Sequence, residues 1–212
     1  MKSKFVLLSI GLTVGVTLIG AGTLWFSRPY TFNGSVIEPP IAAADFRLRD
    51  QNDRPFRLSD QGGKIVLMFF GYTSCPDACP ATLAQFRQVR ADLGREADRV
   101  RFVLVTVDPE RDTAERLREY LAGFDPAFIG LTGSPADMES VWQSYGVYRE
   151  KRPLEAASQA GSHGHAGENY TVDHPTRIYA VDTRGNLRLT YSAEARAAEI
   201  ARDVQHLLRG GN

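Results

Sequence analysis

The chain has 212 residues, and its 25 Lys and Arg side chains balance its 25 Asp and Glu side chains. A chain without net charge is not typical of nucleic-acid-binding proteins, which need a basic face for phosphates. Hydrophobic residues make up 43% of the chain and charged residues 24%, which are ordinary values for a globular protein. Its two cysteines are too few for a disulfide-rich scaffold or a four-cysteine zinc site.

The N-terminal segment differs from the rest of the chain because it carries basic side chains and no acidic ones. Residues 5–26 contain no charge, and about 20 apolar residues suffice for a helix to cross a bilayer. A cleaved signal peptide is the alternative, but its apolar region is usually only about 7–15 residues long. We therefore expect residues 1–28 to form an uncleaved transmembrane anchor. Lys2 and Lys4 precede the apolar run, so the positive-inside rule places the N-terminus in the cytoplasm.

This orientation predicts a single-pass protein of a bacterial inner membrane, with the remaining chain in the periplasm. Residues 29–44 contain three prolines and an Asn-Gly pair, a composition that predicts an extended tether. A domain over residues 45–212 follows. It begins with a predicted hairpin of the short segments 45–49 and 55–58. The uninterrupted apolar run 65–70 predicts a strand that is buried on both faces.

The rest of the domain alternates between strands and helices, which predicts an α/β fold with a central sheet flanked by helices. The last two strands are linked by so short a turn that they must be antiparallel, which makes the sheet mixed. The expected elements are a helix at 80–93, a strand at 100–107, a helix at 113–124, a strand at 128–131, a helix capped by Ser134, strands at 177–181 and 187–191, and a helix capped by Ser192.

Both cysteines lie between the first buried strand and the helix that follows it. Pro76 and Pro80 cannot both occupy the first position of one helix, because a proline in a helix interior clashes with the preceding turn. We therefore expect Cys75 to Cys79 to form an irregular turn, with the helix beginning at Pro80. The two sulfur atoms then lie near a helix N-terminus, where the helix dipole favours thiolates.

The residues alone leave three interpretations of the cysteine pair open. A structural disulfide would close a very short loop and so would remove little chain entropy. The pair could instead be a redox-active dithiol, or part of a soft-metal site in which thiolates select an ion such as Cu(I). Since two thiolates rarely complete a metal site, a third ligand is needed.

His174 is the candidate for that third ligand, because Pro175 favours an extended conformation for it just before a predicted central strand. His163 and His165 lie in a stretch rich in Gly, Ala and Ser, which we expect to be a solvated, mobile loop. The fourth histidine, His206, lies on the last predicted helix and is interpreted as a surface residue.

The sequence resembles the Sco (SenC-type) family at three places, namely residues 69–80, 107–113 and 170–174. These segments contain the Cys-Pro-x-x-Cys-Pro run, a Val-Asp-Pro-Glu-Arg-Asp-Thr run and a Val-Asp-His sequence. The similarity covers residues 36–208, and the expected membrane anchor also matches. The resemblance implies a thioredoxin-like fold in a membrane-anchored copper protein that takes part in cytochrome c oxidase assembly.

By this resemblance Cys75 and Cys79 are the sulfur ligands, and His174 the imidazole ligand, of one copper ion per domain. The implied function is a metallochaperone that delivers copper to the binuclear copper site of cytochrome c oxidase subunit II. The resemblance also allows a periplasmic thiol–disulfide reductase, in which Cys75 and Cys79 are the redox-active pair that keeps the cysteines of that copper site reduced. A membrane-tethered assembly partner without either chemistry is the third hypothesis.

Two further positions bear on these expectations. Pro175 stands where the family pattern leads us to expect a small hydroxyl residue, so it is expected to alter the angle at which His174 approaches the metal. Asp108 is followed by Pro109 at the end of a predicted strand. We interpret Asp108 as a turn residue rather than as a residue of the site.

Overall fold

The structure is a computed structural model, and it describes residues 30–153 and 170–211. The expected membrane anchor, His163 and His165 lie outside the described residues. Within the described ranges, no helix combines the length and the apolar character that crossing a membrane requires. The chain divides into a unit Met1–Thr31 and a unit Phe32–Asn212, and the second unit contains all the elements described below.

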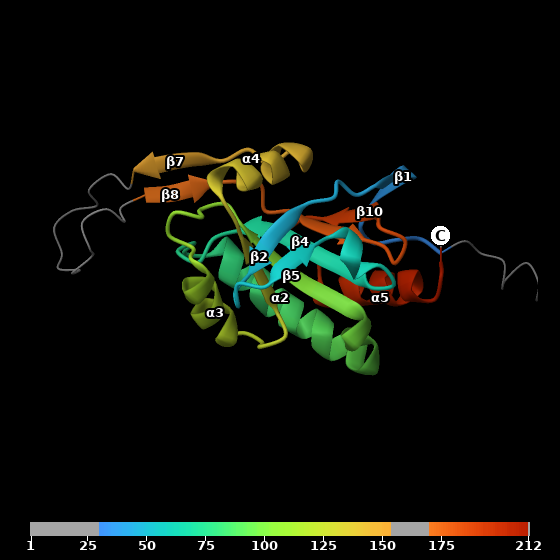
Figure 1. Ribbon diagram of the computed structural model, residues 1–212. Coiled ribbons are helices and arrows are strands. Elements are labelled where there is room, and N and C mark those ends of the chain that lie inside the picture. Colours follow the sequence, from blue (N-terminus) through green and yellow to red (C-terminus); the bar gives the residue numbers. More distant parts are fainter. Residues whose placement is uncertain (1–29, 154–169, 212) are drawn as a thin grey trace, which may run out of the picture. The chain divides into compact units, whose positions relative to one another are not determined.

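A mixed sheet of eight strands forms the centre of the domain (Figure 1). Across the sheet the strands are β1 (Ser35–Ala42), β10 (Asn186–Tyr191), β9 (Ile178–Val181), β4 (Ile65–Gly71), β5 (Val100–Thr106), β6 (Ile129–Thr132), β2 (Arg47–Asp50) and β3 (Pro55–Arg57). The middle strands β4, β5 and β6 are parallel, as expected for a βαβ arrangement, whereas the neighbouring β9 is antiparallel to β4 and β10 is antiparallel to β9.

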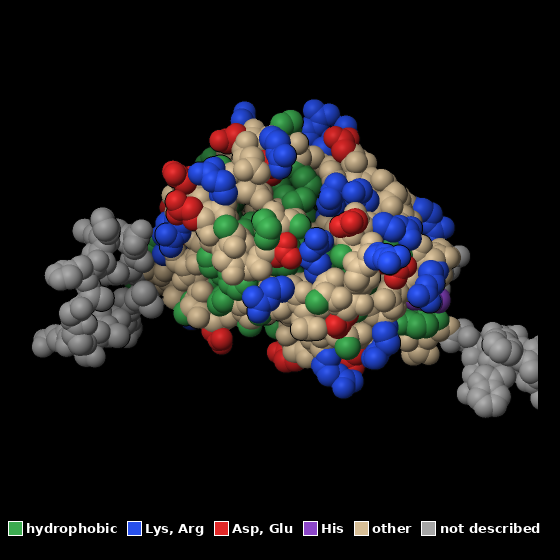
Figure 2. All heavy atoms as spheres, turned by 90° about the horizontal axis from the view of Figure 1, so that it is seen from below, with side chains coloured by type: hydrophobic (Ala, Val, Ile, Leu, Met, Phe, Trp, Pro, Cys, Tyr) green, Lys and Arg blue, Asp and Glu red, His purple; other side chains and the backbone are tan. Residues whose placement is uncertain are grey.

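Helices cover both faces of this sheet. Three of them, α2 (Ala78–Leu93), α3 (Ala114–Ala122) and α5 (Ala197–Leu208), lie on one face, and α4 (Pro135–Ser144) lies on the other (Figure 1). Figure 2 shows the outer side of the three-helix layer, over which charged side chains of both signs are spread. The expected α/β fold with a central mixed sheet flanked by helices is therefore confirmed.

The central strand β4 is buried along its whole length, as its apolar run predicts. Successive side chains of a strand point to opposite faces. The Phe69 ring accordingly packs edge-on against Phe86 of α2, at 5.4 Å between centroids. The Phe70 ring points to the other face, where it lies 5.7 Å from both Tyr145 and Tyr179. The two hydrophobic layers fix the position of the end of β4. Residues 72–79, called the cysteine segment below, follow directly after it.

The segment expected to be an extended tether is instead partly a strand of the domain. Within residues 29–44, β1 occupies Ser35–Ala42 and pairs with the edge of β10. A register shift interrupts the pairing between Val36 and Ile41, and both prolines of the strand lie in that interruption. The proline nitrogens, which cannot donate, therefore interrupt no ladder hydrogen bond, and an edge strand tolerates them.

A buried carboxylate fastens the residues just before β1. The Asp203 side chain of α5 accepts hydrogen bonds from the backbone N–H of Asn33 at 3.0 Å and of Gly34 at 2.9 Å. The side chain of Asn33 also donates to it, at 2.8 Å, and the Tyr191 hydroxyl does so at 3.2 Å. These contacts attach the N-terminal edge of the domain to its last helix, a connection that the sequence did not suggest.

Two helices begin at other residues than predicted. Helix α2 begins at Ala78, so Pro80 is its third residue rather than its first. The first N–H groups of a helix have no intrahelical partner, and a proline there costs no hydrogen bond. Helix α5 begins at Ala197 with Arg196 and Glu199 in a capping arrangement, while the carbonyl of the predicted cap Ser192 accepts a turn hydrogen bond from Ala195.

Candidate metal centre

The two cysteines lie where the chain passes from β4 into α2. Cys75 is half-buried in the turn, and Cys79 is the second residue of the helix and only 1% exposed. Both are free thiols. The backbone N–H of Cys79 donates to the Cys75 sulfur at 3.4 Å, so this sulfur caps one of the N–H groups that the start of a helix leaves without a partner. The expected position at a helix N-terminus is confirmed.

The two sulfurs differ strongly in acidity because they share a proton. A hydrogen bond from the Cys79 thiol lowers the pKa of Cys75 to about 4, against the opposing effect of burial, and His174 and the backbone N–H groups of Cys79 and Asp77 lower it further. The same hydrogen bond, with burial and the charge on Cys75, raises the pKa of Cys79. At neutral pH the metal-free pair is therefore one thiolate and one thiol.

His174 reaches the cysteines from a hairpin that the sequence did not predict. Strands β7 (Glu150–Pro153) and β8 (Tyr170–Asp173) pair with each other in a separate two-stranded sheet (Figure 1). His174 follows β8 directly, and its Nε2 lies 3.9 Å from the Cys79 sulfur. The ligand atoms of Cys75, Cys79 and His174 all lie within 4.8 Å of one another. The structure thus brings together the three residues that the sequence singled out.

The orientation of the His174 ring leaves Nε2 available. Its Nδ1 lies 3.1 Å from the carbonyl oxygen of Pro175, and in the tautomer with the proton on Nδ1 the Nε2 lone pair is left for a metal. The ring also packs edge-on against the buried Tyr72, at 5.8 Å between centroids. The carbonyl oxygen of Pro175 thus orients the imidazole, and the three residues converge with a proline at position 175. The expected effect of Pro175 on the angle at which His174 approaches a metal stays a prediction.

Gly71, the last residue of β4, makes room for the Cys79 sulfur. A Cβ atom at this position would lie 2.7 Å from that sulfur and 2.8 Å from the Phe69 ring, closer than atoms can approach. Any side chain at residue 71 would thus displace a ligand. Sequence analysis did not single out Gly71, because its requirement arises from a sulfur eight residues further along the chain.

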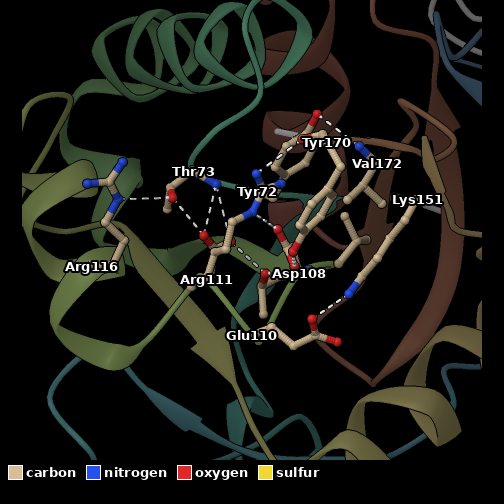
Figure 3. Close-up of polar contacts among 12 residues, drawn as sticks. Tyr72, Thr73, Asp108, Glu110, Arg111, Arg116, Lys151, Tyr170 and Val172 are labelled. Carbon is tan, nitrogen blue, oxygen red and sulfur yellow. Dashed lines mark hydrogen bonds and ion pairs between the residues drawn. The ribbon is translucent and has the colours of Figure 1, made fainter. Parts of the chain in front are cut away.

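A polar network lies beside the centre (Figure 3), and sequence analysis did not predict it, although its residues lie in the three segments that carry the family resemblance. Asp108 is fully buried, accepts a hydrogen bond from the Tyr170 hydroxyl at 2.8 Å and forms an ion pair with Arg111. Asp112, also fully buried, accepts from the Thr73 hydroxyl at 2.6 Å, and its burial raises its pKa. Asp108 does lie in a turn at a strand end, as expected, but its interpretation as a turn residue alone is incomplete, because it contacts β8.

The described histidine that is not part of this group is His206. It lies half-buried on α5, with its ring 5.4 Å from that of Phe32.

Two thiolates and one imidazole form a soft donor set, which suits Cu(I) better than hard cations such as Mg²⁺ or Ca²⁺. Metal–ligand bonds of about 2.0 Å to nitrogen and about 2.3 Å to sulfur place the ligand atoms of a trigonal site roughly 3.7–4.0 Å apart. The group, whose ligand atoms lie within 4.8 Å of one another, therefore fits a small soft ion after a contraction of less than about 1 Å.

Comparison with known proteins points to one family. The model of the SCO1/SenC family matches residues 35–209. The SCO2-like protein of Rickettsia conorii is 33% identical over 177 residues, which cover 79% of this chain and 82% of that protein. The structure of Bradyrhizobium japonicum ScoI with copper bound is 36% identical, with a TM-score of 0.68, over 79% of this chain and 99% of that chain.

A more distant structure shares the fold. BsSco, described as a member of the Sco family of cytochrome c oxidase assembly proteins, is 20% identical with a TM-score of 0.60, over 84% of this chain and 98% of that chain. At this identity the likeness shows the fold alone. The central mixed sheet flanked by helices thus matches the thioredoxin-like architecture of the Sco structures.

Proposed function

The chain belongs to the SCO1/SenC family, and from that membership we propose that it is a copper metallochaperone. It binds one copper ion through Cys75, Cys79 and His174 and delivers it to the binuclear copper site of cytochrome c oxidase subunit II. The observation that carries this proposal is the convergence of the three ligand atoms within 4.8 Å, from segments 95 residues apart.

The chemistry of the three residues supports copper as the cargo. Two sulfur donors favour Cu(I), and a neutral imidazole adds the third donor of a trigonal site. Because Cys75 is already a thiolate at neutral pH, binding the ion has to release the proton of Cys79 alone. The ScoI structure with copper bound, which is 36% identical to this chain, agrees with this assignment.

The partial exposure of the site supports delivery to another protein. Cys75 and His174 are half-buried, whereas Cys79 is closed off from solvent. A three-coordinate ion leaves room for a ligand from an acceptor, so the exposed side can exchange its ligands one at a time. Subunit II of the oxidase is the proposed acceptor because the Sco family is described as one of cytochrome c oxidase assembly proteins.

We further propose that residues 1–28 anchor the chain in a bacterial inner membrane, with the copper-binding domain in the periplasm. The support comes from the uncharged run 5–26 and from Lys2 and Lys4, which precede it. A reporter enzyme that is active only outside the cytoplasm, fused after Asn212, should be active. Activity of a cytoplasmic reporter at the same position would contradict this topology.

The thiol–disulfide reductase remains the second candidate function, because the low pKa of Cys75 also suits attack on a disulfide. Such a reaction needs only the two sulfurs. It needs no metal ligand, and His174, whose Nε2 lies 3.9 Å from the Cys79 sulfur, would contribute to it only by lowering the pKa of Cys75, an effect for which Cys79 is the main cause. His174 therefore distinguishes the two functions.

The test is the variant His174→Ala in the full-length protein, with His206→Ala as the matched control. The wild type and the control should retain one Cu(I) per chain against a competing chelator, whereas His174→Ala should lose stable copper. In the variant, an added oxidant should still convert Cys75 and Cys79 to a disulfide. The variant should fail to support oxidase assembly in cells that lack the native protein. If it supports assembly at low copper, the reductase function takes the place of the chaperone.

A further inference from the structure

The turn between β5 and α3, residues 107–113, contacts both segments that carry the ligands. On one side it holds the cysteine segment. Asp112 accepts hydrogen bonds from the Thr73 backbone N–H at 3.1 Å and from the Thr73 hydroxyl at 2.6 Å, two residues before Cys75. The Thr106 hydroxyl, at the end of β5, donates to the same carboxylate at 2.6 Å. The turn and the cysteine segment are thereby joined through a fully buried side chain.

On its other side the turn holds the histidine hairpin, as Figure 3 shows. The Tyr170 hydroxyl donates to Asp108 at 2.8 Å, and Arg111 donates to the Tyr170 carbonyl at 3.1 Å. The Arg111 guanidinium also lies 3.7 Å from the centroid of the Tyr170 ring while it forms an ion pair with Asp108. Tyr170 is thus held at its hydroxyl, its ring and its carbonyl, four residues before His174.

These side-chain contacts matter because β8 has no place in the central sheet. In the described part of the chain, its ladder partner is β7, and the β7–β8 hairpin pairs with no strand of the eight-stranded sheet. The remaining contacts between β8 and the domain include the Val172 N–H, which donates to the Tyr72 hydroxyl at 3.2 Å, and the buried Val172 side chain. Backbone pairing with the main sheet therefore holds His174 only from its C-terminal side, where β9 begins at Ile178, and leaves the approach of β8 to these contacts.

We propose that Asp108, Arg111 and Tyr170 are positioning residues that place His174 at binding distance from the two sulfurs. The turn at 107–113 connects the two segments, because Asp112 binds the cysteine segment and the Asp108–Arg111 pair binds the hairpin. These contacts determine the distance between the imidazole and the two sulfurs. This inference rests on the proposed copper-binding function and assigns the part of the fold that assembles its third ligand.

The alternative is that these contacts stabilise the fold without any specific effect on His174. Tyr170→Phe distinguishes the two, because it removes the hydrogen bond to Asp108 and retains the ring over Arg111. Tyr148→Phe is the matched control, since the Tyr148 side chain is exposed and its hydroxyl contacts Glu150 at 3.2 Å. Thermal unfolding of each full-length variant shows that the compared proteins are folded.

The central measurement is a double-mutant cycle on Cu(I) affinity. Tyr170→Phe should weaken Cu(I) binding by about tenfold, the lower end of what the loss of a supporting contact costs a metal site. In a His174→Ala background, where a weaker chelator measures the residual Cu(I) binding of the two sulfurs, the same substitution should have no effect, because its influence passes through His174. Tyr148→Phe should change neither background. Equal weakening in both backgrounds, or no weakening in the wild type, would overturn the proposal.

A second measurement works without copper and separates this inference from the proposed function. In the metal-free protein labelled with ¹⁵N-histidine, the ring nitrogen signals of His174, identified by their loss in His174→Ala, should shift in Tyr170→Phe and stay in place in Tyr148→Phe. Unshifted signals in Tyr170→Phe would contradict the positioning role whatever the metal affinity. If the wild type binds no Cu(I) but Tyr170→Phe shows the shift, the copper function is contradicted and the positioning of His174 stays supported.

Discussion

The cysteine segment and the β7–β8 hairpin carry the proposed ligands of one centre, but different interactions determine their positions. The cysteine segment connects a fully buried strand of the main sheet to a long helix, so main-chain hydrogen bonds and core packing hold both of its ends. Strands β7 and β8 pair only with each other, so main-chain pairing holds His174 on one side, through β9, and side-chain contacts attach β8 on the other. Both ends of the sulfur pair are therefore held by the main fold, whereas the imidazole depends in addition on a small number of contacts made by β8.

This difference is consistent with the proposed chaperone function, in which the protein has to release the ion that it binds. The two sulfurs stay together whatever the hairpin does, because Cys75 caps the helix in which Cys79 lies. The proposed position of the third ligand depends on Asp108, Arg111 and Tyr170, of which Asp108 is fully buried. Substitutions on the two sides should accordingly have different consequences.

The largest effect is expected at the anchor of the hairpin. Asp108→Ala leaves the Arg111 guanidinium, whose side chain is only 12% exposed, without the carboxylate that pairs with it. Breaking a buried ion pair in this way should lower the free energy of unfolding by about 3–5 kcal/mol. Chemical denaturation of the full-length protein measures it, with Glu110→Ala in the same turn as an exposed control. A loss as small as that of the control would mean that the hairpin is held mainly by other contacts.

On the cysteine side, Gly71→Ala should have the next largest effect. The added methyl group would lie 2.7 Å from the Cys79 sulfur in a strand where every residue is buried. Overpacking of this kind should cost about 1–3 kcal/mol of unfolding free energy and move one of the two sulfur ligands. We expect weaker Cu(I) binding even where His174 is unchanged. Gly62→Ala, where a Cβ would meet only one backbone oxygen at 3.9 Å, is the control. Unchanged copper affinity in Gly71→Ala would show that the sulfur pair tolerates displacement.

A smaller effect is expected from the exposed contact between the hairpin and the turn. Lys151 of β7 forms an ion pair with Glu110, and both side chains are substantially exposed. Because solvent screens such pairs, Lys151→Met should cost no more than about 1 kcal/mol of unfolding free energy. Comparison with Asp108→Ala ranks the contacts that hold the hairpin. An equal loss in both variants would contradict the conclusion that the buried contacts dominate.

The smallest effect concerns the reactivity of Cys75. Its pKa of about 4 makes it a thiolate at neutral pH. Its alkylation rate in the metal-free protein should therefore be constant at pH values well above this pKa and should fall as the pH drops through about 4. Nucleophilicity decreases with pKa, so at pH 6 the rate should exceed that of an ordinary thiol by only about tenfold or less. Mass spectrometry of the alkylated protein should locate the label on Cys75 and spare the buried Cys79. A rate that rises near pH 9 would contradict the shared proton.

Much of the fold could be predicted from the sequence because it depends on local patterns. The apolar run at 65–70 indicated a doubly buried strand, and the alternation after it indicated an α/β fold, both of which the structure has. Cys75, Cys79 and His174 could be singled out because few residue types supply soft ligands and the chain contains few of them. The prediction of an extended tether at 29–44 was wrong where β1 forms. It relied on the general rule that prolines disfavour strand pairing, whereas β1 places its prolines in an interruption of the ladder.

What the sequence by itself determined is therefore the order of the elements and the identity of the three candidate ligands, since hydrophobic periodicity and side-chain chemistry are properties of neighbouring residues. Only the tertiary structure decided how the ligands meet. The exposed, charged strand β7 has no apolar pattern, and Asp108 contacts Tyr170 across 62 residues of chain. Contacts between such distant residues leave no local signature, because their energy exists only once the core has brought the two segments together.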